Sequence, residues 1–348
     1  MKGKQGLVCM GLLLVLSSCH TGKQITASGL QRKDFQTEVN GQHTDLFTLS
    51  NKQGMEVCIT NYGARVVSIL VPDRNGKRED VVCGFSTITE YMEQRQNFGS
   101  TVGRYIGRIL NARFTLDGVE YKLVPNNGKS GHISHGGNPG FADRIWKVEQ
   151  ADTHRFRLSY LSPDGENGFP GNLKVTLVYS LGEDDNALDL TYEATTDAPT
   201  VLNLSHHSFF NISGNFTKSV EDQQLWVDAD RFTPYDDKKC VTGEYLPVAG
   251  TPLDFRMPHT IGECIDADHP QLKVVNGYDH TWELNTKGDD TRPAAWVYDP
   301  ASGRKMEIFT TEPGMQIYTG NGLKGKMTGK GGIAYPFRSA VCFETMHF

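Results

Sequence analysis

Two short polar clusters inside otherwise apolar stretches contain the residues best suited to proton-transfer chemistry. They are Asn203–Asn211 (NLSHHSFFN) and Ser339–Thr345 (SAVCFET). If both segments are strands, alternate side chains point to opposite faces, so only one of His206 and His207 can enter a given site. A carboxylate on an apolar strand face, such as Glu344, must be paired or its pKa rises, and a pKa near neutrality suits a general base. The alternatives are a structural histidine and an edge glutamate that faces water.

Three further clusters could hold a ligand. These clusters are Gly103–Ile109 (GRYIGRI), His132–Gly137 (HISHGG) and Gly277–His280 (GYDH). The guanidinium groups of the two arginines in the first cluster could each donate several hydrogen bonds to ligand hydroxyls. Surface arginines beside a turn would give the same sequence pattern. Glycines allow the backbone to approach a ligand closely. Two histidines three residues apart could ligate zinc, but no HExxH motif or third ligand at a familiar spacing accompanies them, so no metal site is predicted.

The overall composition argues against several other functions. The net charge of −6 offers no basic footprint for phosphates, so no nucleic-acid partner is expected. Gly320–Gly325 (GNGLKG) matches GxGxxG, yet a glycine-rich loop follows it instead of the helix that a dinucleotide site needs. Beyond Cys9 and Cys19, five of the seven cysteines remain, an odd number at wide spacings, so no disulfide framework is predicted.

The elements that must position these clusters are mostly strands. Alternation of apolar and polar residues recurs along the chain between turn signals, most clearly in Arg155–Leu161, Leu173–Leu181 and Ala187–Ala194. Thr87–Gln94 is expected to form one short helix. No βαβ rhythm and no linker appear within residues 35–348. The sequence therefore predicts one all-β domain, a large antiparallel sandwich of two broad sheets packed face to face.

The first 18 residues have the pattern of a bacterial lipoprotein signal peptide. Two lysines precede the apolar run Leu7–Leu16, which is too short for a mature membrane span. The LSSC sequence that ends at Cys19 resembles a lipobox, in which this cysteine becomes the lipidated first residue. The alternative is an ordinary secretory signal with a chance cysteine. We expect an exported lipoprotein on the periplasmic or outer-membrane face, with residues 19–34 as its tether and the lipid as its only membrane contact.

Taken together and in order, the clusters resemble the galactose mutarotase (aldose 1-epimerase) family. The resemblance runs over roughly residues 45–348. Several short matching segments in the same order along the chain identify a family more specifically than any single motif does. The segments that carry it are Gly103–Ile109, Phe114–Gly118, His135–Trp146, Asn203–Asn211, Gly250–Arg256, Gly277–His280, Glu312–Asn321 and Phe343–Thr345.

The resemblance implies a β-supersandwich enzyme that interconverts the α and β anomers of free aldohexoses such as galactose and glucose. It implies that Glu344 is the general base at the sugar O1 hydroxyl and His207 the general acid at the ring oxygen. It also implies four residues that hold the sugar hydroxyls, which are Arg108, His135, Asp279 and Gln316. Ring opening needs two proton transfers and no oxidation, so neither a cofactor nor a metal is expected.

Three other functions stay open on the sequence alone. One is a non-catalytic carbohydrate-binding lipoprotein on the same scaffold, since a fold does not dictate a function. Another is a glycoside hydrolase or lyase that uses Asp279 and Glu344 as paired carboxylates. The third is a metal enzyme that uses the histidine clusters, which insensitivity to chelators would exclude. Nothing in the sequence indicates a stable oligomer, and we expect a monomer or weak dimer.

The sequence departs from the family pattern at three places. Gly107 and His206 stand where relatives often have asparagine, and the chain stops at Phe348, where relatives usually continue with closing strands. From this last departure we expect the C-terminal strands to be missing, the sheet edge to be unpaired and Glu344 to be held loosely.

Overall fold

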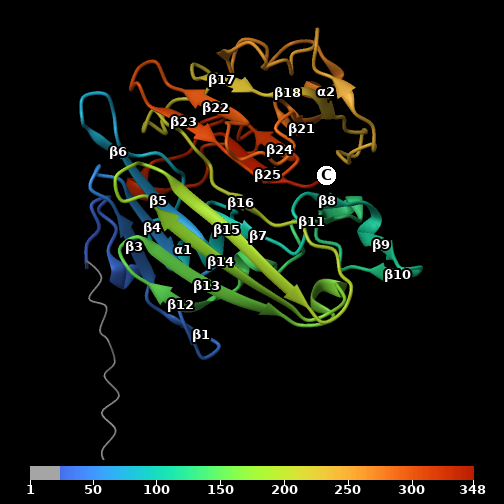
Figure 1. The fold of residues 1–348 in the computed structure, drawn as a ribbon, viewed down its shortest axis with the longest axis horizontal. Coiled ribbons are helices and arrows are strands. Elements are labelled where there is room, and N and C mark those ends of the chain that lie inside the picture. Colours follow the sequence, from blue (N-terminus) through green and yellow to red (C-terminus); the bar gives the residue numbers. More distant parts are fainter. Residues whose placement is uncertain (1–23) are drawn as a thin grey trace, which may run out of the picture.

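The computed structural model describes residues 24–348, and antiparallel strands dominate them. Predicted signal residues 1–18 and Cys19 lie outside the described part of the chain. Two four-stranded sheets form one half of the molecule (Figure 1). In their spatial order, the strands of these sheets are β3 (Leu46–Ser50), β4 (Glu56–Thr60), β5 (Arg65–Pro72) and β6 (Arg78–Asp80), then β12 (Lys147–Ala151), β13 (Arg155–Ser162), β14 (Leu173–Leu181) and β15 (Leu188–Thr196).

The other half contains a four-stranded and a five-stranded sheet. The strands of the first, in order, are β20 (His259–Thr260), β17 (Gln224–Val227), β22 (Ala295–Tyr298) and β23 (Lys305–Ile308). Those of the second are β19 (Leu246–Pro247), β18 (Ala229–Thr233), β21 (Asp279–Leu284), β24 (Gly314–Tyr318) and β25 (Cys342–Met346).

Short ribbons and turns connect the large sheets. The paired ribbons are β1 (Glu38–Val39) with β2 (Gln42–His43), β7 (Ser100–Val102) with β16 (Ser205–His207), β8 (Arg108–Ile109) with β11 (Ile133–Ser134), and β9 (Arg113–Leu116) with β10 (Val119–Lys122). The helices are α1 (Ile88–Gln94) and α2 (Pro270–Val275), and the 3₁₀ turns are Arg32–Phe35, Leu110–Ala112, Gly128–Ser130, Phe141–Asp143, Glu166–Gly168 and Lys330–Gly332.

Alternating apolar residues explain why the sheets pack face to face. In the N-terminal half, Val57 and Val66 share one buried core with Phe156 and Val175, so the two four-stranded sheets cover each other. Removing apolar surface of this kind from water is the main stabilising contribution to folding.

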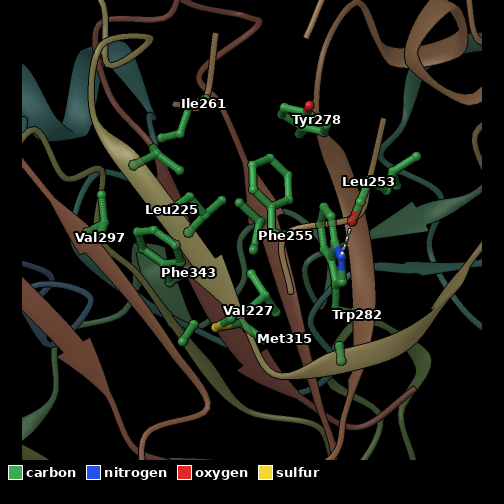
Figure 2. Close-up of a cluster of buried hydrophobic side chains, with 14 of the residues drawn as sticks. Leu225, Val227, Leu253, Phe255, Ile261, Tyr278, Trp282, Val297, Met315 and Phe343 are labelled. Atoms are coloured by element: carbon green, nitrogen blue, oxygen red, sulfur yellow. Dashed lines mark hydrogen bonds between the residues drawn. The ribbon is translucent and has the colours of Figure 1, made fainter. Parts of the chain in front are cut away.

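The C-terminal half has a core of its own, which Figure 2 shows around Trp282 and Phe255. The Trp282 indole lies within this apolar core and donates a hydrogen bond from Nε1 to the carbonyl oxygen of Leu253, at 3.0 Å. This bond satisfies the one polar atom of a fully buried ring. β21, β24 and β25 therefore pack against this core.

The predicted elements correspond closely to the observed ones. The three alternating segments are β13, β14 and β15, and the predicted helix is α1. Thr87 caps that helix, because its hydroxyl accepts from the Glu90 amide while the Glu90 carboxylate accepts from the Thr87 amide. The prediction of an all-β sandwich is confirmed.

The predicted tether differs from the structure over residues 24–34, which pack on the folded body. Leu30 is buried, and the amide of Ala27 donates to Glu56 Oε1 at 2.7 Å. Arg32 forms an ion pair with Asp45. The folded part therefore includes residues 24–34 and does not begin at residue 35. Within residues 24–348, no helix combines the length and apolar character needed to cross a membrane.

Candidate active site

One pocket of about 470 Å³ lies where the short ribbons meet the five-stranded sheet. All six side chains that the sequence singles out for the site line it, although they come from β8, β16, β21, β24 and β25 and the loop after β11. These residues are Arg108, His135, His207, Asp279, Gln316 and Glu344. The structure thus brings together groups that are up to 236 positions apart in the chain.

Strand pairing decides which of the two adjacent histidines reaches this pocket. β16 pairs with β7, with His206 opposite Thr101 and His207 opposite Ser100. His207 lines the pocket, whereas His206 is absent from its lining and packs edge-on against Tyr179. The prediction that only one of His206 and His207 enters the site is confirmed.

His207 and Glu344 form the chemical centre of the pocket. His207 Nε2 lies 3.4 Å from Glu344 Oε1, and both side chains are almost fully buried. Burial raises the pKa of the Glu344 carboxyl well above its usual value, and the nearby Asp279 raises it further. Burial also lowers the pKa of His207 to about 4. Both pKa shifts have the same cause, because a charged group loses its hydration when it is buried. Together they favour a His207–Glu344 pair that holds one proton in total.

A second group of residues is fixed by hydrogen bonds across the sheet. Gln316 lies opposite Glu344 in the pairing of β24 with β25. Its amide nitrogen donates to Asp279 Oδ1 at 2.6 Å and to the Tyr235 hydroxyl at 3.0 Å. Its amide oxygen accepts from Thr281 Oγ1 at 2.5 Å. These three bonds define the orientation of the amide and hold Asp279 toward the pocket.

Burial raises the pKa of Asp279, while Arg108 and the Gln316 amide oppose that increase. The Arg108 guanidinium donates from Nη1 to the Lys239 carbonyl at 3.2 Å and lies 5.8 Å from the centre of the Tyr235 ring. A cation beside a buried carboxylate provides donors and acceptors for neighbouring hydroxyl groups of a ligand.

His135 completes the wall next to His207. Its backbone amide donates to the Gly107 carbonyl at 2.9 Å, and its φ of +53° is the left-handed conformation. The ring lies edge-on to that of His207, with centroids 5.5 Å apart. Burial, followed by the charges of His207 and Arg108, lowers the pKa of His135 to about 3. Nδ1 of this neutral imidazole is buried and has no hydrogen-bond partner among residues 24–348, so it can bind a hydroxyl group.

Other residues of the predicted clusters have structural roles. Arg104 is buried away from the pocket and donates to Ser162 Oγ and to the carbonyls of Pro163 and Gly171, among others. His132 Nδ1 accepts from the Asn111 amide at 3.0 Å. His280 faces the C-terminal core, next to Phe232 and Trp282.

The sequence missed Tyr235, which is buried at the pocket and contacts both Gln316 and Arg108. It follows β18, in a loop with no recognisable motif. Only the distant pairing of β18 with β21 brings it to the site, so no local signal could have identified it.

The expected loosening of Glu344 is not observed. β25 is the last strand in the order of its sheet, yet Glu344 is only 4% exposed. Asn203 donates from Nδ2 to the His347 carbonyl and accepts from the His347 amide, each at 3.0 Å. The Tyr105 hydroxyl donates to the Phe348 carbonyl at 3.0 Å. The two bonds of Asn203, which we call the Asn203 clamp, hold the end of β25 against the segment before β16.

Comparison with known proteins places this geometry in a family. Galactose mutarotase from Sus scrofa is 39% identical over 302 residues, covering 87% of this chain and 85% of that protein. Aldose 1-epimerase from Escherichia coli is 36% identical over 286 residues, covering 82% and 81%.

Two solved structures share the fold. The GalM/aldose epimerase homologue from C. elegans has a TM-score of 0.79 at 30% identity, covering 87% of this chain and 89% of its own. Galactose 1-epimerase from Lactobacillus acidophilus has a TM-score of 0.78 at 29% identity, covering 89% and 88%. The aldose 1-epimerase family model matches residues 45–348, a range that includes every pocket side chain described above. The chain therefore belongs to the aldose 1-epimerase family.

Proposed function

We propose that the protein is an aldose 1-epimerase that interconverts the α and β anomers of free aldohexoses such as galactose and glucose. The observation that carries the proposal is the buried pair of His207 Nε2 and Glu344 Oε1, 3.4 Å apart in a pocket lined by hydroxyl-binding groups. An acid and a base side by side are what a reaction with two coupled proton transfers requires.

At rest the pair's single proton favours Glu344, because the pKa of this carboxyl is raised and that of His207 is lowered, and the cycle begins when the proton lies on His207 instead. Glu344, as a carboxylate, removes the proton from the O1 hydroxyl while His207 protonates the ring oxygen, and the bond between C1 and the ring oxygen breaks. The open-chain aldehyde then rotates about the C1–C2 bond. Closure onto the other face of the carbonyl carbon returns the ring-oxygen proton to His207 and the Glu344 proton to O1. The pair holds one proton at every stage, and each positioned transfer contributes about 10²–10⁴-fold.

The remaining pocket groups hold the sugar during rotation. Asp279 accepts from sugar hydroxyls, Arg108 donates to them, and the imidazole of His135 can do either. Gln316 already uses its amide nitrogen for Asp279 and Tyr235, so it acts on the sugar partly by keeping Asp279 in place. No part of this scheme needs a cofactor.

The direct test follows the rotation of polarised light, or the anomeric proton signals, after α-galactose or α-glucose is dissolved with the full chain. We expect the protein to accelerate equilibration well beyond the spontaneous rate. Calorimetric binding of the sugar without any acceleration would overturn the proposal and favour a carbohydrate-binding protein. Release of monosaccharides from oligosaccharides would instead indicate a hydrolase.

We also propose that the chain is an exported lipoprotein, lipidated at Cys19 and facing the periplasm or the outer membrane. The support is the N-terminal sequence alone, with its lysines, apolar run and LSSC motif. Labelled fatty acid should be incorporated into the wild-type chain, and Cys19→Ser should abolish this incorporation.

We also propose that the protein is a monomer or weak dimer. The proposal is supported by a pocket whose six predicted side chains all come from one chain. Size-exclusion chromatography tests it.

A further inference from the structure

We propose that His207, Cys342 and Glu344 form a binding site for a soft divalent cation, with Zn²⁺ as the ion. By occupying the acid and base, the ion inhibits the enzyme. The site uses none of the four side chains proposed to hold the sugar hydroxyls. It shares only His207 and Glu344 with the proposed catalysis. Only the inhibition rests on the proposed function, because the binding of metal can be measured without any sugar.

The three potential ligand atoms are already close together. One nitrogen of His207, Sγ of Cys342 and one carboxylate oxygen of Glu344 all lie within 4.8 Å of one another. Ligand atoms around a tetrahedral zinc ion lie about 3.3–3.8 Å apart, since zinc–ligand bonds are about 2.0–2.3 Å. The His207–Glu344 separation of 3.4 Å already meets this requirement, and the thiol needs to approach by at most about 1.5 Å.

The backbone explains why the thiol and the carboxylate converge. Cys342 and Glu344 are two residues apart on β25, so they share a strand face. The pairing with β24 places them opposite Tyr318 and Gln316, which both line the pocket. His207 reaches the same point from β16.

The chemistry of the three ligands selects the ion. Imidazole and thiolate favour zinc and other soft ions, whereas Mg²⁺ and Ca²⁺ prefer all-oxygen sites. A thiolate and a carboxylate together neutralise the two positive charges of Zn²⁺, so the complex carries no net charge into a buried site. Binding releases two protons to the solvent, one from the thiol and one from the His207–Glu344 pair.

Burial is the main factor that opposes binding, because it raises the pKa of the Cys342 thiol well above its usual value and zinc must displace that proton. The Cys342 thiol forms no hydrogen bond with the described residues, and His207 Nδ1 is buried without a partner. Cys342 lies behind the pocket wall, while His207 and Glu344 line the pocket itself. The ion therefore enters through the sugar pocket, with its fourth position open to water or a hydroxyl, and it prevents both proton transfers while bound.

Metal binding is tested first on the wild-type chain, without substrate. Equilibrium dialysis with Zn²⁺ should give one tight site per chain, and Co²⁺ should give the absorption band of a cobalt–thiolate bond. Adding Zn²⁺ should displace Co²⁺ and remove the band, whereas Mg²⁺ should not. Absence of both a tight zinc site and a thiolate band would overturn the proposal, whether or not the protein is a mutarotase.

Variants then identify the ligand. Cys342→Ser and Cys342→Ala should each lose the cobalt–thiolate band, and each should raise the zinc concentration for half-inhibition at least about 10-fold relative to its own metal-free rate. Cys264→Ser is the matched control, since Cys264 is a free thiol outside the pocket lining, and it should keep both properties. A band or a zinc sensitivity that persists in both Cys342 variants would refute the site.

Discussion

At the scale of single residues, the pocket contains two adjacent groups, Glu344 and His207. Burial destabilises the charged form of each. Glu344 has a raised pKa and His207 a lowered one, and Nε2 of His207 lies 3.4 Å from Oε1 of Glu344. Removing either partner leaves the other without a proton donor or acceptor, so the two should behave as one catalytic unit.

Glu344→Gln and His207→Ala should therefore each lower kcat by at least about 10²-fold, because each removes one positioned proton transfer. Polarimetry at saturating galactose measures the rates, and circular dichroism checks that the fold persists. His206→Asn is the matched control, since that ring points away from the pocket toward Tyr179, and it should stay within a few-fold of wild type. Near-normal rates in both catalytic variants would contradict the assigned roles.

Tyr235 is the residue-scale feature that the sequence did not reveal. Tyr235→Phe removes the hydroxyl that accepts from the Gln316 amide while preserving the ring beside Arg108. One hydrogen bond of about 1 kcal/mol corresponds to roughly a 5-fold change, and we expect it as a higher KM with little change in kcat. An unchanged KM would show that Gln316 does not need this bond to hold Asp279.

At the scale of elements, β25 is the strand on which the site most depends. It carries Glu344 at the end of the sheet order, and the Asn203 clamp fixes the backbone just beyond it. The clamp joins β25 to the segment that leads into β16, so the proposed base and the proposed acid are held by one connection.

Breaking that clamp should therefore affect chemistry more than binding. Asn203→Leu should lower kcat by about 10-fold, since unsatisfied peptide groups at His347 cost about 1–3 kcal/mol and displace Glu344, while KM changes little. Asn203→Asp, which keeps only the acceptor, should recover part of the loss. Tyr105→Phe, which removes only an exposed bond, serves as the control. Wild-type kcat in Asn203→Leu would show that the clamp does not position the base.

Sequence alone could identify many of these elements because their side chains alternate. β13 and β14 are long, with one apolar face, and period-2 patterning also separated His206 from His207. The packing of residues 24–34 could not be predicted, because a single buried Leu30 leaves no periodic pattern. The burial of Arg104 was equally hidden, since its partners are mostly backbone carbonyls, which any sequence provides.

At the scale of the whole molecule, buried neutral histidines are a shared feature of the site and its supports. Burial lowers the pKa of His135, His206 and His280 to about 3 and that of His207 to about 4, from a usual 6.5. The unfolded chain therefore takes up protons first as the pH falls below 6.5. The stability that these groups contribute is complete above this pH and decreases as the pH falls toward 3–4.

The free energy of unfolding, measured with urea between pH 7 and pH 5, should thus fall on acidification, because these four histidines outnumber Glu344 and Asp279, whose raised pKa values act in the opposite direction. Each buried histidine contributes a slope of up to roughly 1.4 kcal/mol per pH unit below its unfolded pKa. His280→Gln should reduce this slope by about the contribution of one buried histidine, whatever effect the substitution has on the free energy of unfolding at pH 7. His43→Gln, at an exposed histidine, is the control. An equal slope in His280→Gln and wild type would contradict this explanation.

Because the buried pair holds one proton throughout the proposed cycle, the reaction rate should respond little to dissolved ions. The pocket ends each turnover with the charge it had at the start, and an aldohexose is neutral, so no net charge crosses between solvent and protein. Dissolved ions screen exposed charges over about 8–10 Å but act weakly on buried ones. The kcat/KM for galactose should therefore stay constant from dilute buffer to high salt, and a steep dependence on ionic strength would show that a charge moves across the pocket boundary during the reaction.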